Sequence, residues 1–213
     1  MVHLSRCFGI AAFLLTAPAW GDILYSNGAI NGTIGGYDFT DAVISDPFVL
    51  SFDSTLTGVT NIGIWVGNGI AIDGLDWSIS TGAGGIGTVE ASSSSSTDFS
   101  ATELMPTSAY GHGGFNVYDV SFTLDNLSLA AGTYYLTLSN GAAASGVLYW
   151  DAISPTGTIP YGNVCDAFGD CEPSENPYTN PFEVDGTAPE PAGVALLGAG
   201  LVALGVLKRR KKD

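Results

Sequence analysis

Short stretches of alternating apolar and polar residues, separated by Gly, Asn, Asp and Ser, make up the middle of this chain. Within residues 75–79, for example, Leu75, Trp77 and Ile79 fall on one face of an extended backbone, as in a half-buried β-strand. Comparable stretches are residues 23–25, 48–52, 59–66, 115–124, 133–138 and 147–150. No long helical period interrupts them. The pattern therefore predicts an all-β fold, an antiparallel β-sandwich with a jelly-roll-like topology.

Several local features refine this prediction. The apolar phase changes at Tyr118 and Asp119, which indicates a β-bulge. Asn140-Gly141 is typical of a hairpin turn, with residues 147–150 as the return strand. The first strand is expected to lie beside the last, near residues 182–184. The low-complexity stretches 82–87 and 92–96 are expected in loops or at sheet edges.

The first 21 residues have the features of a secretory signal peptide. Arg6 lies in a short basic start, residues 8–15 are apolar, and small residues at alternate positions precede Asp22. This pattern predicts export through the Sec translocon and cleavage by signal peptidase. Cys7 would be discarded with this segment.

Residues 188–213 form a tail of three parts. Pro189-Glu190-Pro191 precedes 16 uncharged residues, 192–207, and a basic cluster follows: Lys208, Arg209, Arg210, Lys211 and Lys212. Sixteen residues make about 24 Å of helix, slightly less than a usual membrane span. Long basic side chains can make up the difference, and clustered cations stay on the cytoplasmic side. The tail therefore predicts a C-terminal transmembrane helix, with the preceding domain outside the cytoplasm. A buried C-terminal helix with a solvated basic end is the alternative.

This tail resembles the PEP-CTERM sorting signal of Gram-negative, exopolysaccharide-producing bacteria. The resemblance implies that an exosortase recognises Pro189, Glu190 and Pro191 as its substrate and removes the tail. The protein would then pass from the inner membrane to the cell surface or the extracellular matrix. A recurring exported module of PEP-CTERM proteins is similar to four stretches of this chain: residues 23–28, 76–79, 131–138 and 149–151. This second resemblance implies no biochemical activity.

Between these ends, residues 22–187 form one domain whose charged side chains are all acidic. They hold 19 of the chain's 21 Asp and Glu residues and none of its six Lys and Arg residues, a formal charge of −19. Such a surface cannot neutralise a phosphate backbone, so nucleic-acid binding is excluded. The carboxylates must face water, accept hydrogen bonds or share a cation such as Ca²⁺.

Cys165 and Cys171 are the cysteines outside the signal peptide. In an exported protein they are expected to form a disulfide within a long acidic loop, residues 155–181. Neither a catalytic thiolate nor a zinc site is supported, because no His or cation lies near them in the sequence.

Calcium is the one cofactor that the sequence leaves open, with a solvated acidic loop as the alternative. The spacing of the acids does not match an EF-hand. The candidate ligands in the loop are Asp166, Asp170, Glu172 and Glu175, and a weaker pair is Asp73 and Asp76.

No catalytic constellation is visible in the domain. His112 lies in a Gly-rich stretch, but no G-x-S-x-G nucleophile elbow accompanies it. The expected function is therefore a non-enzymatic, structural or adhesive role in exopolysaccharide. The alternative is a carbohydrate-binding, lectin-like module, for which the sequence leaves calcium dependence open, and hydrolysis by paired carboxylates ranks third. Among the aromatic residues, Trp77 and Trp150 are expected in the core, and the surface candidates are Tyr110, Tyr118, Tyr161 and Tyr178.

Overall fold

The computed structural model describes residues 22–32, 35–67, 70–105, 114–154, 163–165, 171–173 and 178–188. These residues form thirteen strands and one short 3-10 turn, Ala83–Gly85. The strands are β1 (Asp22–Ser26), β2 (Gly36–Asp38), β3 (Val43–Leu50), β4 (Ser54–Gly67), β5 (Ile72–Ser80), β6 (Val89–Ser96), β7 (Ser100–Met105), β8 (Phe115–Leu129), β9 (Gly132–Ala143), β10 (Tyr149–Asp151), β11 (Asn163–Cys165), β12 (Cys171–Pro173) and β13 (Glu183–Thr187). The predicted all-β, antiparallel character is confirmed.

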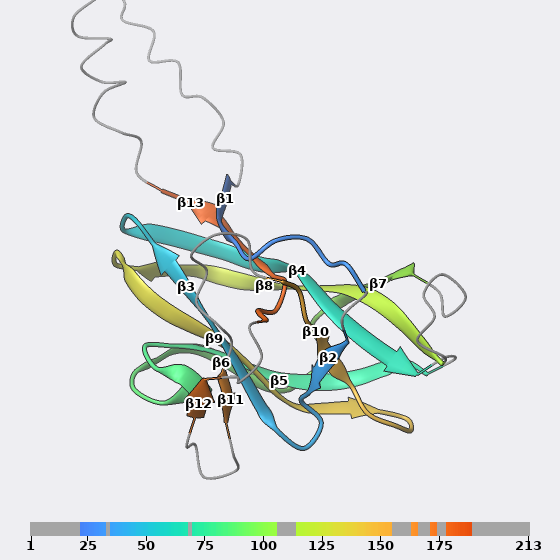
Figure 1. Cartoon of the computed structure of the whole chain (residues 1–213). Helices are drawn as coiled ribbons and strands as arrows, with labels where there is room; N and C mark the ends of the chain where they lie inside the picture. Colours follow the sequence, from blue (N-terminus) through green and yellow to red (C-terminus); the bar gives the residue numbers. More distant parts are fainter. Residues whose placement is uncertain are drawn as a thin grey trace, which may run out of the picture.

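The strands form two sheets (Figure 1). In the seven-stranded sheet, the long strand β4 pairs with β8 along one edge, and with β13 and then β10 along the other. Strands β1, β2 and β7 complete this sheet. The six-stranded sheet has the order β12-β11-β3-β9-β5-β6. The serine-rich stretch 92–96 belongs to the edge strand β6, as the sequence predicted.

One hydrophobic core joins the two sheets. Ile62, Ile64 and Val66 of β4 alternate inward and belong to the same buried cluster as Leu136 and Leu138 of β9. Each such side chain contributes about 1.5–3 kcal/mol when it leaves water. Burial of apolar residues from both sheets is therefore what holds the sheets together.

Two tryptophans lie in the core region, as predicted. Trp150 is fully buried, and its indole nitrogen donates a hydrogen bond to the Pro181 carbonyl over 3.2 Å. Trp77 of β5 is partly buried and stacks on Phe122 of β8, with ring centroids 4.4 Å apart. This stacked pair links one sheet to the other.

The predicted pairing of the first strand with the last is confirmed. β1 runs antiparallel to β13, with Asp22 opposite Gly186 and Ser26 opposite Glu183. The two strands lie side by side at one end of the domain (Figure 1). Both ends of the described domain are therefore held within the same sheet.

The bulge predicted at Tyr118 and Asp119 is wrong. Both residues pair with β4 without a register shift. The β7–β8 ladder does shift beside Tyr118, but the extra residue there is Leu104 of β7. The apolar phase changes because β8 buries residues on both of its faces. Val120 points into the main core, whereas Val117 packs on the opposite face against Trp65.

Three asparagines with positive φ lie at irregularities of the ladders. Asn61, Asn126 and Asn140 have φ values of 55°, 50° and 48°, and each lies where a strand register shifts. Asn tolerates this left-handed conformation better than most residues. The predicted hairpin turn at Asn140-Gly141 is therefore wrong, because β9 continues through it to Ala143. β10 is no return strand for β9, since it joins β2 and β4 in the other sheet.

Candidate functional site

An aromatic cluster lies on the face of the seven-stranded sheet that points away from the main core. Trp65 of β4 sits between Val117 of β8 and Tyr149 of β10, and both are its direct partners in the ladders. Phe115 and Tyr149 pack against this small cluster. The alternation of side chains along β4 explains the position of Trp65, because its neighbours in the chain point into the main core.

Hydrogen bonds to a buried carboxylate fix the tryptophan ring. The Trp65 indole nitrogen donates to Asp151 Oδ1 over 2.8 Å. The backbone N–H groups of Asn31 and Gly32 donate to Asp151 Oδ2 over 3.1 and 3.2 Å. Burial raises the pKa of Asp151, and these donors partly oppose that rise. Asp151 thus positions both Trp65 and the backbone around residue 31.

A hollow of about 360 Å³ opens over this cluster, lined by Gly35, Gly36, Trp65, Phe115 and Tyr149. The Phe115 and Tyr149 rings meet edge to face, with centroids 5.6 Å apart and planes at 82°. Gly35 and Gly36 bring no side chain to the hollow. At Gly36 a Cβ atom would lie 2.6 Å from the Trp150 carbonyl oxygen, so a larger residue would not fit there. We call these five residues the aromatic hollow. It offers ring faces and edges, and none of its described lining residues is charged.

A second buried carboxylate, Asp46, lies on the core-facing side of β3. Asn27 Nδ2 donates to its Oδ1 over 3.1 Å, and the Asn180 N–H donates to its Oδ2 over 2.7 Å. The Thr179 hydroxyl lies within 3.0 Å of both oxygens. Desolvation raises the pKa of Asp46 to about 8, although the hydrogen bonds from Asn180, Thr179 and Asn27 oppose this effect. Asp46 therefore joins three separate chain segments.

Asn27 extends this network to Tyr25, whose hydroxyl has two acceptors within hydrogen-bond distance, Asn27 Oδ1 and the Pro47 carbonyl. Burial, assisted by the nearby charge of Asp46, raises the pKa of Tyr25. The Asn180 side chain donates to the Asp151 backbone carbonyl over 2.8 Å and so links the surroundings of Asp46 to those of Asp151. The arrangement is enclosed and holds β1, β3 and β10 to the segment before β13.

A hydroxyl-lined groove of about 560 Å³ lies elsewhere on the seven-stranded sheet. Its lining includes Thr57, Thr60, Ser121, Thr123, Asp98 and Asp185. The Thr60 hydroxyl donates to Asp185 Oδ2 over 2.8 Å, while Asp98 is exposed to solvent. Carboxylates in such contact with water lack the enclosure that tunes a general acid.

Cys165 and Cys171 are direct partners in the β11–β12 ladder. Backbones of antiparallel partners lie roughly 4.5–5.5 Å apart, within the range that disulfides bridge. This register supports the disulfide, which stays a prediction. The expected long acidic loop is in part strand, because β11 pairs with β3 and extends the six-stranded sheet.

The structure describes some of the predicted calcium ligands and not others. Glu172 lies in β12, opposite Val164, whereas Asp166, Asp170 and Glu175 lie outside the described residues. Asp73 is exposed, and Asp76 accepts a hydrogen bond from Asn140 over 2.7 Å. Within the described ranges, no three His, Cys, Asp or Glu side chains gather in a way that could hold a metal ion.

Other predicted residues also fall outside the described part of the chain. They include the signal peptide, Pro189, Glu190 and Pro191, the basic cluster, His112, Tyr110 and Tyr161. None of the described segments is a helix of sufficient length and apolarity to cross a membrane. Of the surface tyrosines, Tyr118 and Tyr178 are both partly buried.

Sequence reasoning did not single out Phe115 and Tyr149 as site residues. They looked like ordinary members of alternating strands, and the partnership of β4 with β8 and β10 brings them beside Trp65. The change of phase at Tyr118 and Asp119 was the available signal, because it marks a strand with two apolar faces. Comparisons of the chain with protein-family models, with curated proteins and with solved structures found no match.

Proposed function

We propose that this chain is an exported, non-enzymatic protein that an exosortase sorts to the cell surface or the exopolysaccharide matrix, where it has a structural or adhesive role. On this proposal the chain first enters the inner membrane with its domain outside the cytoplasm. The supporting observation is the pairing of Asp22 with Gly186. Both predicted processing sites are close to this pair of residues in the sequence, so removal of the flanking segments would leave the core strands in place.

The strand order supports a β-sandwich of jelly-roll topology. Eight of the thirteen strands form the central part of the two sheets: β1, β3, β4, β5, β6, β8, β9 and β13. Numbered one to eight along the chain, they have the order 1-8-3-6 in one sheet and 2-7-4-5 in the other. This interleaving of distant strands matches the strand order of a double Greek key and so supports a jelly roll, an architecture found in lectins.

The surroundings of the two buried carboxylates favour a non-enzymatic role. Asp46 and Asp151 both have a raised pKa, as catalytic acids often do. Each is surrounded by hydrogen-bond donors of the fold itself, and neither lines the aromatic hollow or the hydroxyl-lined groove. The raised pKa values of Asp46 and Asp151 are thus explained by their burial between packed chain segments.

Sorting is tested by measuring the mass of the protein recovered from the culture medium and the cell surface, in host cells with and without the exosortase. We expect a product that begins near Asp22 and ends near Pro189, and this product should be lost when the exosortase gene is deleted. Changing Pro189-Glu190-Pro191 to three alanines should have the same effect. A full-length protein embedded in the membrane of wild-type cells would contradict the proposal.

A second candidate function is carbohydrate binding at the aromatic hollow. Rings set at steep angles to one another can contact the apolar C–H face and the edge of one sugar ring. Among the residues that the structure describes, no charged one lines the hollow, and residues 22–187 contain no Lys or Arg. An acidic polysaccharide would meet only like charge on this domain. The expected ligand is therefore a neutral glycan.

This function is tested by calorimetric titration with the host's own exopolysaccharide and with neutral and uronic-acid oligosaccharides, with and without calcium. We expect Tyr149→Ala to weaken binding of the neutral glycan roughly tenfold, since an aromatic contact is worth about 1 kcal/mol or slightly more. Phe52→Ala removes an exposed aromatic ring outside the hollow and should leave binding unchanged. Equal loss in both variants, or binding of uronic-acid glycans alone, would refute the assignment.

A further inference from the structure

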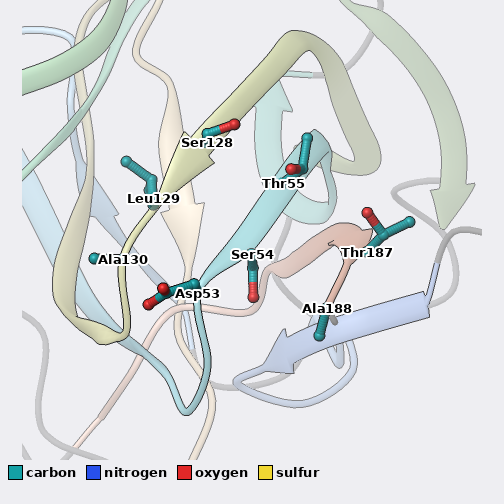
Figure 2. A pocket seen from close by; sticks show the side chains of 8 residues that line it. All are labelled: Asp53, Ser54, Thr55, Ser128, Leu129, Ala130, Thr187 and Ala188. Atoms are coloured by element: carbon teal, nitrogen blue, oxygen red, sulfur yellow. The ribbon is translucent and has the colours of Figure 1, made fainter. Parts of the chain in front are cut away.

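Both ends of the described domain emerge beside two adjoining hollows. One, of about 470 Å³, is lined by the start of β1, by residues 50–52 and 54, and by Ala188. The other, of about 500 Å³, is lined by Asp53, Ser54, the end of β8 and Thr187 and Ala188 (Figure 2). Since Ser54 and Ala188 line both hollows, the two form one continuous surface, which we call the end face.

The end face exposes large apolar side chains. Ile23 and Phe52 are 58% and 65% exposed, and both line the first of the two hollows. Phe52 lies in the turn between β3 and β4 and is more exposed than any other large apolar residue in the described part of the chain. Ile86 and Leu104, which are also exposed, lie on other elements.

The length of chain beyond Ala188 limits what can lie next to this surface. The uncharged run, residues 192–207, begins four residues after Ala188. Four residues span at most about 14 Å even when fully extended. The apolar environment that residues 192–207 enter must therefore lie within about 14 Å of Ala188. A bilayer is such an environment, and the end face is then the part of the domain nearest to it.

We propose that the end face rests on the outer surface of the bilayer while the tail is attached, with Ile23 and Phe52 in the lipid interface. This inference rests on the proposed membrane-anchored stage of sorting. Asp22 and Asp53 belong to the same surface, so attraction to anionic lipid cannot hold it there. The contact depends on the tether, which keeps the exposed apolar side chains at high local concentration near the membrane, and it is released when the tail is removed.

The experiment uses the full chain reconstituted in liposomes of phosphatidylethanolamine and phosphatidylcholine. A photo-crosslinking benzoylphenylalanine replaces Phe52 in one variant and Leu104 in a control, and lipid adducts are measured by mass spectrometry. Both positions are exposed, so either variant should fold. We expect at least fivefold more lipid adduct from position 52 than from position 104. Cleavage of the tail before illumination should abolish the difference.

The outcomes separate this inference from the proposal on which it rests. If the chain floats with the liposomes but both positions give equal adduct, or none, the end face does not contact lipid and the inference is wrong, while anchoring stands. A crosslinked protein dimer from position 52 would instead assign the end face to a second copy and would also overturn the inference. Failure of the chain to float with the liposomes would refute the anchored stage itself.

Discussion

Replacing Asp46 by Asn should make the free energy of unfolding of this domain less dependent on pH. Asp46 is fully buried, and desolvation raises its pKa to about 8. In the unfolded chain an Asp has a pKa of about 3.9. The folded protein therefore holds the proton more tightly than the unfolded chain. The stabilising contribution of neutral Asp46 is complete below about pH 4 and is lost as the pH rises towards 8.

The size of the effect follows from the two pKa values. One pKa unit corresponds to about 1.4 kcal/mol, so ionising Asp46 inside the folded protein costs at most about 6 kcal/mol. Asn has nearly the same shape and no charge. Its amide group, however, would face one of the donors that now bind the carboxyl oxygens, at a cost of about 1–3 kcal/mol. We therefore expect Asp46→Asn to be the less stable protein at pH 5 and to match or exceed the wild type at pH 9.

The assay is urea unfolding followed by tryptophan fluorescence at intervals from pH 5 to pH 9. Repulsion among the other carboxylates also lowers stability as the pH rises, and the difference between the two proteins cancels this shared effect. Asp73→Asn removes the same charge at an exposed position, so its pH dependence should follow that of the wild type. A constant difference between wild type and Asp46→Asn across the whole range would refute the reasoning, because it would mean that Asp46 keeps one ionisation state throughout.

Two further predictions concern packing and the disulfide. Gly141→Ala places a Cβ atom 2.6 Å from a ring carbon of Phe39 and should lower the free energy of unfolding by about 1–3 kcal/mol in chemical denaturation. Gly132→Ala, on the same strand with its nearest neighbour at 3.6 Å, should change it by less than about 0.5 kcal/mol, and equal losses would contradict the packing argument. Cys165→Ser should cost about 2–3 kcal/mol without reductant and nothing with it. Two free thiols in the unreduced wild-type domain, one each at Cys165 and Cys171, would show that the disulfide does not form.

The amino-acid sequence alone was sufficient for the class of fold, because side chains alternate across a strand whatever its partners are. It also predicted the pairing of the first strand with the last and the burial of Trp150. Local turn chemistry was less informative. Asn140-Gly141 suits a hairpin turn, but Asn tolerates positive φ equally well inside a strand, and the surrounding ladders decide which of the two occurs.

The site was decided by tertiary structure. Trp65, Phe115 and Tyr149 are far apart in the sequence, and only the pairing of β4 with β8 on one edge and β10 on the other brings them together. The same holds for the buried acids. Nothing local distinguishes Asp46 from the exposed Asp73, since burial depends on which distant segments cover a carboxylate and donate hydrogen bonds to it. Alternation is a property of each strand by itself, whereas the neighbours of a side chain belong to the whole fold.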